Sequence, residues 1–301
     1  MELRVLRYFL AVAREGNVTR AAAALHVTQP TLSRQLADLE RELGCTLFVR
    51  GNRGATLTDD GMFLRKRAEE IVALADRTER EMLSPSTQLE GDIYFGAAET
   101  RAMDPVLRSF RRLHDANPRV SLHLHSGNAD AVVEGVEKGL FDFGLTMGRE
   151  VDSKFCSLPV PFTDTWGLIV RADDALASRE SVTVEELEGM PLLFSSQEAS
   201  SGEGELARSI DGLDLDRLNI VATYNLVYNA SLMVEQGMGA AFSIDGLVTP
   251  APGRFAFVPV EGLPPLRSTI VWKRFQMLPK AAQAFLDVLR EDFAAASAPE
   301  G

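Results

Sequence analysis

The side chains best suited to molecular recognition stand in one short stretch, Gln29-Pro30-Thr31-Leu32-Ser33-Arg34-Gln35. Arginine can donate two hydrogen bonds to a guanine edge, and glutamine can pair in the same way with adenine. The Thr31 and Ser33 hydroxyls suit phosphate oxygens or pyrimidine edges, and Pro30 can contact a thymine methyl group. If this stretch opens a helix, its exposed N-terminal positions predict contacts in the DNA major groove. The candidate DNA-reading residues are Gln29, Pro30, Thr31, Ser33, Arg34 and Gln35.

The surrounding sequence predicts three short helices that hold this stretch. Apolar residues recur at helical spacing from Leu3 onward until Gly16, which ends the first helix. Asn17 is a good N-cap for a second, alanine-rich helix. Thr28 caps a third helix that ends at Gly44 and has Pro30 in its first turn, where proline is tolerated. Two helices joined by a turn of a few residues predict a helix-turn-helix.

Two short apolar runs follow, over residues 46–50 and 55–57, and Gly51-Asn52-Arg53-Gly54 lies between them. Apolar runs on both sides of a glycine-rich turn predict a β-hairpin, the wing of a winged helix-turn-helix. Arg53 at the tip is expected to meet phosphate or the minor groove. Arg50 either supports that contact or forms an ion pair that holds the wing.

Thr58 is expected to cap a long helix, in which Asp59 and Asp60 suit the positive end of the helix dipole. Apolar or small residues along it alternate spacings of four and three, which is typical of a coiled-coil seam. The seam indicates a dimer, and the alternative is packing against the helix's own domain. A linker is expected over residues 84–88. The seam residues are Leu64, Ala68, Ile71, Ala75, Thr78 and Met82.

From Gly91 onward, strands are expected to alternate with helices, which predicts a parallel, doubly wound α/β sheet. The expected strands cover residues 93–98, 120–125, 141–146, 166–170, 192–195, 240–243 and 269–272. The expected helices cover residues 106–113, 129–138, 230–236 and 279–295.

Charge and composition narrow the class of protein. Residues 1–58 hold eight arginines and five acidic residues, a charge of +3, whereas the chain carries −12 and the remainder therefore −15. A local basic face is what binds phosphate, so the acidic total does not exclude DNA. We see no nucleophile elbow, phosphate loop or catalytic triad, so an enzyme is not expected.

Other signals are weak. Cys45 and Cys156 follow no ligand spacing and are expected to be reduced thiols. His123 and His125 alone would make a weak metal site, so neither a metal nor a cofactor is expected. The chain contains no run of 18 apolar residues, so no membrane span is expected. No signal peptide pattern is seen at the first residues, and a cytoplasmic location is therefore expected.

These residues resemble the LysR-type family of bacterial transcription regulators. The match is dense in the N-terminal part: residues 17–22, then Leu25 to Leu36, then 39–44 and 47–50, and Leu57-Thr58 with Gly61. A looser match follows at 110–118 and 135–145. The resemblance covers essentially the whole chain.

The resemblance implies a winged helix-turn-helix over residues 1–58, a linker and dimerisation helix over 59–88, and an α/β effector domain over 89–301. This last domain would have two lobes, like a periplasmic binding protein. Lobe I would comprise 91–161 and 267–301, and lobe II would comprise 162–266. The partners implied are promoter DNA, a second copy in a dimer or tetramer, a small effector between the lobes, and RNA polymerase.

Ligands of open α/β sheets collect at the carboxyl ends of the strands. The family often uses a serine or threonine after the first strand, frequently for a carboxylate, and Thr100 matches. Glu99 would repel such an anion unless Arg101 offset its charge. Six candidate effector contacts lie at predicted strand ends, namely Thr100, Arg101, Asn128, Thr146, Ser195 and Ser196. Two more, Thr223 and Asn225, precede a predicted helix of lobe II.

Two other functions remain open from the sequence. A solute-binding protein without DNA function would not explain residues 1–58. A thiol-based redox regulator would require a partner thiol for Cys156, and Cys45 lies in the expected DNA-binding part.

Overall fold

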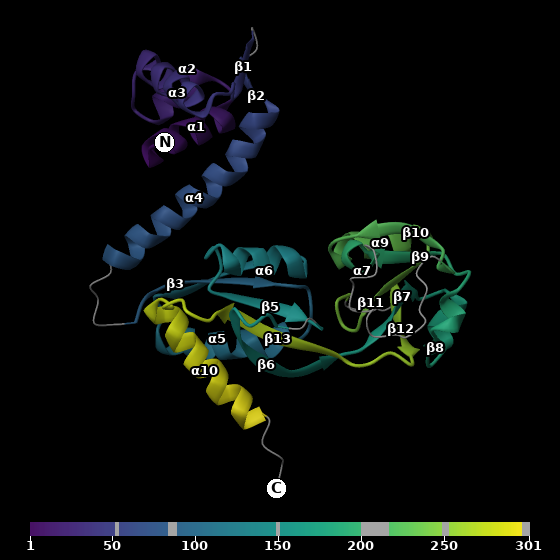
Figure 1. Cartoon of the computed structure of the whole chain (residues 1–301). Coiled ribbons are helices and arrows are strands. Elements are labelled where there is room, and N and C mark those ends of the chain that lie inside the picture. Colours follow the sequence, from purple (N-terminus) through teal and green to yellow (C-terminus); the bar gives the residue numbers. More distant parts are fainter. Residues whose placement is uncertain (52–53, 84–88, 149–150, 200–216, 249–252, 297–301) are drawn as a thin grey trace. The chain divides into compact units, whose positions relative to one another are not determined.

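The structure, a computed structural model, describes residues 1–51, 54–83, 89–148, 151–199, 217–248 and 253–296 (Figure 1). It divides into two compact units, Met1–Pro85 and Ser86–Gly301. The division lies within three residues of the predicted end of the linker helix. The long helix therefore groups with the N-terminal unit and does not form a unit of its own.

The N-terminal unit contains the predicted winged helix-turn-helix. Its elements are α1 (Leu3–Glu15), α2 (Val18–Ala24), α3 (Gln29–Leu43), and the antiparallel pair β1 (Phe48–Gly51) and β2 (Gly54–Leu57). Asn17 accepts hydrogen bonds from the amides of Thr19 and Arg20, and Thr28 accepts one from Thr31. Gly16 and Gly44 end α1 and α3 in the left-handed conformation. The predicted caps and helix ends are thereby confirmed.

The core of this unit requires a close approach between α1 and the wing. Phe9, Leu32, Leu36 and Leu39 are buried in it. Gly54 has a φ of +125°, and a Cβ there would lie 2.2 Å from the carbonyl oxygen of Gly16. Only glycine fits without displacing the backbone, so the wing is held against the end of α1.

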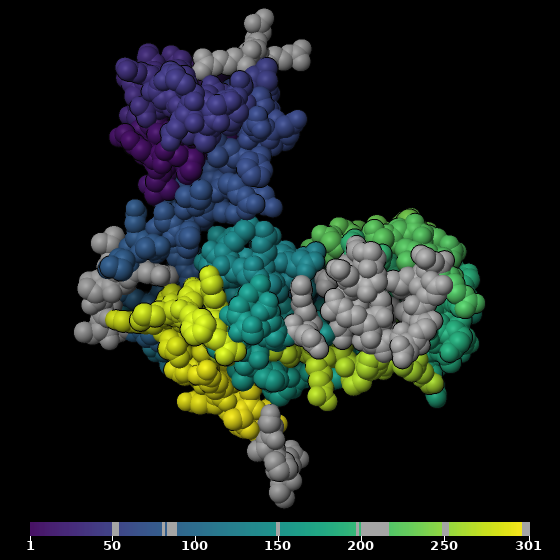
Figure 2. Space-filling view, in the orientation of Figure 1, coloured from purple at the N-terminus to yellow at the C-terminus, as the bar shows by residue number. Residues whose placement is uncertain are grey.

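The long helix α4 (Asp59–Leu83) begins where expected, since the Thr58 hydroxyl accepts a hydrogen bond from the Gly61 amide at 3.0 Å. Figure 1 shows α1 beside the first part of α4, and the last turns of α4 project past it, as the space-filling view also shows (Figure 2). Arg7 of α1 forms an ion pair with Asp76. Leu64 and Ala68 are buried in the core of the unit itself. The prediction that these two residues belong to the dimer seam is wrong, because packing within their own domain already covers them.

Lobe I of the C-terminal unit is built on a five-stranded sheet of order β4-β3-β5-β13-β6. Helix α6 covers one face, and α5 and α10 cover the other (Figure 1). The elements are β3 (Gly91–Ala97), α5 (Met103–Ala116), β4 (Val120–Ser126), α6 (Ala129–Glu137), β5 (Phe143–Met147), β6 (Phe155–Asp164), β13 (Leu266–Lys273) and α10 (Lys280–Ala296).

Lobe II is built on a six-stranded sheet of order β10-β9-β11-β7-β12-β8. Its elements are β7 (Trp166–Arg171), the 3-10 turn η1 (Ala175–Ser178), β8 (Val182–Thr183), η2 (Glu185–Leu187), β9 (Leu192–Ser195), α7 (Ser196–Ala199), β10 (Ile220–Tyr224), α9 (Val227–Glu235), β11 (Ala240–Ile244) and β12 (Phe255–Glu261).

Both sheets are mixed, which corrects the expectation of a parallel sheet. Strand β3 is parallel to β4 and β5, but β13 is antiparallel to β5 and β6. In lobe II, β7 is antiparallel to β11 and β12. The antiparallel strands belong to the two crossings between lobes, where the chain leaves lobe I after Asp164 and returns at Leu266. These crossings lie within three residues of the predicted ones.

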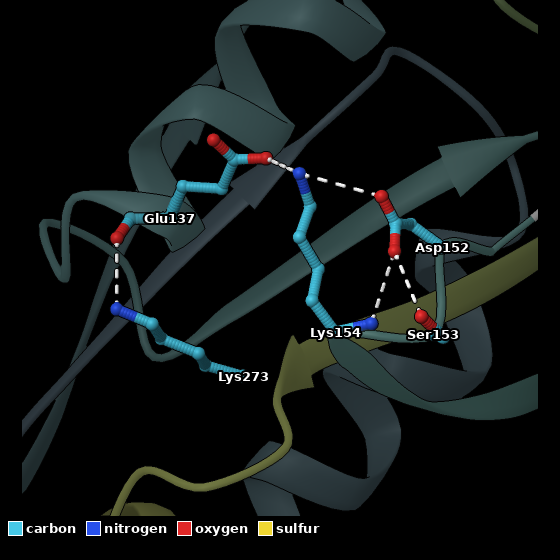
Figure 3. A network of polar contacts seen from close by, with 5 residues as sticks. All are labelled: Glu137, Asp152, Ser153, Lys154 and Lys273. Atoms are coloured by element: carbon cyan, nitrogen blue, oxygen red, sulfur yellow. Dashed lines mark hydrogen bonds and ion pairs between the residues drawn. The ribbon is translucent and has the colours of Figure 1, made fainter.

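A surface network fixes the end of α6 to the neighbouring strands (Figure 3). The Lys154 ammonium lies between the carboxylates of Glu137 and Asp152, and Lys273 donates to the Glu137 backbone oxygen at 3.1 Å. The hydrogen bond to Glu137 raises the pKa of Lys154, and the Lys154 backbone amide lowers the pKa of Asp152. The network is exposed, so it contributes little to the free energy of unfolding.

In the described part of the chain, no helix is both long enough and apolar enough to cross a bilayer.

Candidate DNA-reading helix and ligand cleft

The N-terminal turns of α3 present the predicted polar surface. Gln29, Pro30, Thr31 and Arg34 are exposed, and Ser33 and Gln35 are half-buried. The Gln29 amide donates to the Ser33 hydroxyl at 2.9 Å. The hydroxyls of Thr28 and Thr31 lie 2.8 Å apart. Local bonds therefore orient part of this surface before any ligand arrives.

Arg34 differs from the other arginines of these helices. Arg4, Arg7, Arg14 and Arg41 each pair with an acidic side chain, and the Arg20 guanidinium donates to the backbone oxygen of Glu15. Arg34 forms no ion pair with any described residue and stands exposed on α3. Its guanidinium can thus bind an external acceptor without breaking an internal pair. The Arg50 side chain and all of Arg53 lie outside the described residues, so their predicted roles remain predictions.

The exposed face of α4 is apolar over its second half. Ile71 and Leu74 are each 41 % exposed and Met82 is 82 % exposed. Together with Ala75, Thr78 and Glu79 they line a shallow hollow, here called the α4 stripe. Four of the six predicted seam residues lie on it, and Leu74 adds to them. The heptad pattern did not predict Leu74, because it stands between the assigned positions.

A cavity of about 100 Å³ lies between the two lobes of the C-terminal unit. Three of the predicted effector residues line it, namely Asn128, Ser195 and Asn225. Asn128 also caps α6 by accepting from the Ala131 amide at 2.9 Å. Most of the wall is apolar or aromatic, from Met147, Trp166, Tyr224, Leu226, Val227, Phe242, Ile244, Leu247 and Leu266.

These apolar residues were not predicted, although some of them had a signal. Ile244 ends β11, next to Ser243, which also lines the cavity, and the strand-end rule that selected Ser195 applies to both. Trp166 begins β7 beside the crossing, and its ring stacks on Phe242 at 5.3 Å between centroids. Their approach depends on the pairing of β11 with β7, which single-sequence patterns do not reveal.

Thr100 does not line this cavity and is 7 % exposed. Its hydroxyl donates to Asp164 at 2.6 Å and accepts from the Ala102 amide at 2.9 Å. Both capacities of the hydroxyl are therefore used inside the protein. The expectation that Thr100 holds the effector is corrected: it ties the loop after β3 to the strand that crosses between lobes.

Four further candidates also lie away from the cavity lining. Thr146 is buried within β5, and Thr223 is exposed on β10. Ser196 donates to the Tyr224 backbone oxygen at 3.1 Å. Arg101 lies 3.8 Å from Asp104 and stacks over the Phe162 ring. The strand-end rule placed these residues near the correct edge without resolving which way each side chain points.

Glu99 lines the cavity and connects the two lobes. Its carboxylate accepts a hydrogen bond of 2.8 Å from the amide of Val227, the first residue of α9. A carboxylate there satisfies a helix donor and suits the positive end of the helix dipole. The loop after β3 in lobe I thus caps a helix of lobe II.

Asp164 is a buried carboxyl at the crossing, and burial raises its pKa above the ordinary value of 3.8. A raised folded-state pKa means that stability declines as pH rises through that pKa. We expect Asp164→Asn to remove this decline, because a carboxamide does not titrate in this pH range. The fold should be retained, since the amide oxygen can still accept from Thr100. The difference in unfolding temperature, variant minus wild type, should become more positive from about pH 4 to pH 7.

Tryptophan fluorescence measures this directly, since Trp166 and Trp272 both lie in the C-terminal unit. Asp152→Asn is the matched control with the opposite sign. The pKa of the Asp152 carboxyl is lowered, so the contribution of this residue to stability is present at neutral pH and is lost as pH falls. A difference for Asp164→Asn that shrinks toward pH 7 would refute the assignment.

Cys45 and Cys156 are free thiols, half-buried and in different units. Among the described residues, no group of three or more histidine, cysteine or acidic side chains could hold a metal ion.

The fold and these sites define a class of protein, a winged helix-turn-helix regulator with a two-lobed ligand-binding domain. The model of the bacterial regulatory helix-turn-helix protein, lysR family, matches residues 3–62, and that of the LysR substrate binding domain matches residues 86–294. The chain belongs to the LysR family of transcription regulators and is not an enzyme.

Individual relatives agree with this family. The Hca operon transcriptional activator HcaR of Escherichia coli K12 is 28 % identical over 99 % of this chain and 100 % of its own. The uncharacterized regulator YnfL of the same organism is 30 % identical over 84 % of this chain and 80 % of its own. CbnR, in a crystal structure with its target DNA, has a TM-score of 0.73 at 21 % identity and covers 97 % of this chain and 100 % of its own.

Proposed function

We propose that the chain controls transcription by binding double-stranded promoter DNA through the exposed N-terminal turns of α3. The observation that carries this proposal is Arg34, an exposed arginine without an ion pair among the described residues, beside Gln29 and Thr31. The charge of +3 over residues 1–58 supports phosphate contact. The wing residues Arg50 and Arg53 would add phosphate or minor-groove contacts. Cytoplasmic location follows from such a target.

The same proposal includes self-association through the α4 stripe, as a dimer or a dimer of dimers. Ile71, Leu74 and Met82 expose apolar side chains on one hollow face of α4. Leaving these side chains in water is unfavourable, and a contiguous exposed apolar face is typical of an interaction site. A two-fold pair of stripes would bury them and hold two α3 helices at a fixed separation. Dyad-symmetric DNA is the target expected of such a pair.

The cavity between the lobes is the proposed effector site. A ligand there would touch Asn128 of lobe I and Ser195 and Asn225 of lobe II, so its binding energy would depend on the closure of the lobes. We expect a shift between two arrangements of the protomers, which changes the DNA bend or the contact with RNA polymerase. The free, separated cysteines give no support to a thiol switch.

Selection of binding sites from a random duplex library tests this function with the full chain. The expected result is enrichment of an inverted repeat whose half-sites are about 10 base pairs apart, or a multiple of that. A library without any enriched sequence would contradict DNA reading. Enrichment of a single asymmetric site would contradict the two-fold arrangement alone.

A further inference from the structure

The charge of the cavity wall bears on what the cavity can bind. Among the described residues that line it, Glu99 is the one charged side chain, and no described arginine or lysine lines it. The basic residue nearest to Glu99 in sequence is Arg101, and its guanidinium lies beside the Asp104 carboxylate and over the Phe162 ring. An incoming carboxylate would meet a like charge in a partly apolar cavity, where repulsion is strong.

The favourable anion position of this cleft is already filled. The first amide of α9 points into the region that anions prefer at helix N-termini. The Glu99 carboxylate accepts from that amide, Val227 N–H, at 2.8 Å. A carboxylate ligand would have to displace Glu99, whose charge would then lie in the cleft without a donor.

The second carboxylate oxygen of Glu99 favours a hydrogen-bond donor, not an anion. Oε2 accepts the hydrogen bond from the Val227 amide, and Oε1 has no hydrogen-bond donor among the described residues. An N–H group of a ligand can fill that position. Trp166 lines the same wall, and an indole ring attracts cations. A cavity of about 100 Å³ suits an apolar body no larger than roughly one ring.

From these contacts we propose that the cleft binds a small primary amine with an apolar body, whose ammonium group hydrogen-bonds to Glu99. The proposal rests on the cleft being the effector site, as proposed above. The apolar body would lie against Trp166, and Asn128 and Asn225 in the lining would supply further acceptors. The anionic effector implied by Thr100 is replaced, since that hydroxyl binds Asp164.

Three probes that share a ring test the head group: benzylamine, benzyl alcohol and benzoate, titrated calorimetrically into the full chain. We expect benzylamine to bind at least about tenfold more tightly than benzoate, because a hydrogen bond to a charged acceptor is gained. Glu99→Gln should remove this preference. Its amide oxygen can still accept from Val227, so the cap and the fold are retained.

Glu180→Gln, an exposed glutamate outside the cavity lining, is the matched control and should leave benzylamine binding unchanged. Tighter binding of benzoate than of benzylamine would overturn the proposal. So would benzylamine binding that Glu99→Gln does not weaken, or the absence of binding by all three probes at millimolar concentration. DNA binding, measured on the same preparation, reports separately on the proposed function.

Discussion

Replacing Leu74 by glutamate is expected to convert the full chain to a monomer and to weaken its DNA binding by about 100-fold. Leu74 is 41 % exposed and lies on the α4 stripe. Across a two-fold axis each copy would place its new carboxylate against the apolar stripe of the other, where it loses its water without gaining a partner. The second half of the DNA site would then no longer be bound at high effective concentration.

Sedimentation velocity at micromolar concentration measures the mass, and anisotropy of a labelled duplex measures the affinity. The N-terminal unit should stay folded, because an exposed side chain contributes little to the packing of the core. Leu107→Glu is the matched control, since Leu107 of α5 is 40 % exposed and lies outside the stripe. A Leu74→Glu variant with the wild-type mass would show that α4 does not form the interface.

The features predicted correctly from the sequence depend on neighbours in the chain. Asn17 and Thr28 cap helices by contacts across two or three residues, and Gly16 and Gly44 end helices by their own conformation. Local patterns carry such information directly. The N-terminal fold and the helix ends could therefore be predicted closely.

The features that the sequence did not reveal depend on distant partners. Thr100 binds Asp164, 64 residues away, so nothing near Thr100 marks it as occupied. Strands β6, β8, β10 and β12 were not predicted. Pro159 and Pro161 interrupt the β6 pattern, and Pro259 interrupts β12. The heptad pattern of α4 could not separate Leu64, covered by its own domain, from Ile71, which is exposed.

Arg34→Ala is expected to cost about 1–3 kcal/mol of specific DNA binding for each recognition helix, or roughly 5- to 150-fold in Kd. The physical reason is the loss of two hydrogen bonds to one base edge. No ion pair with a described residue is broken by the change, because Arg34 forms none, so the stability of the domain should not fall. The loss should be concentrated on the selected sequence, and binding to unrelated duplexes should change little.

The most direct test of DNA reading by α3 is fluorescence anisotropy of the selected duplex, titrated with the wild-type full chain and with two variants at one fixed salt concentration. Arg34→Ala should raise Kd by at least the stated factor, because both recognition helices of a dimer carry the change. Arg14→Ala, which removes an arginine that lies beside Glu15 on α1, should leave Kd unchanged. An Arg34→Ala affinity equal to that of the wild type on the selected duplex would contradict the account, since α3 would then not read the DNA through this residue.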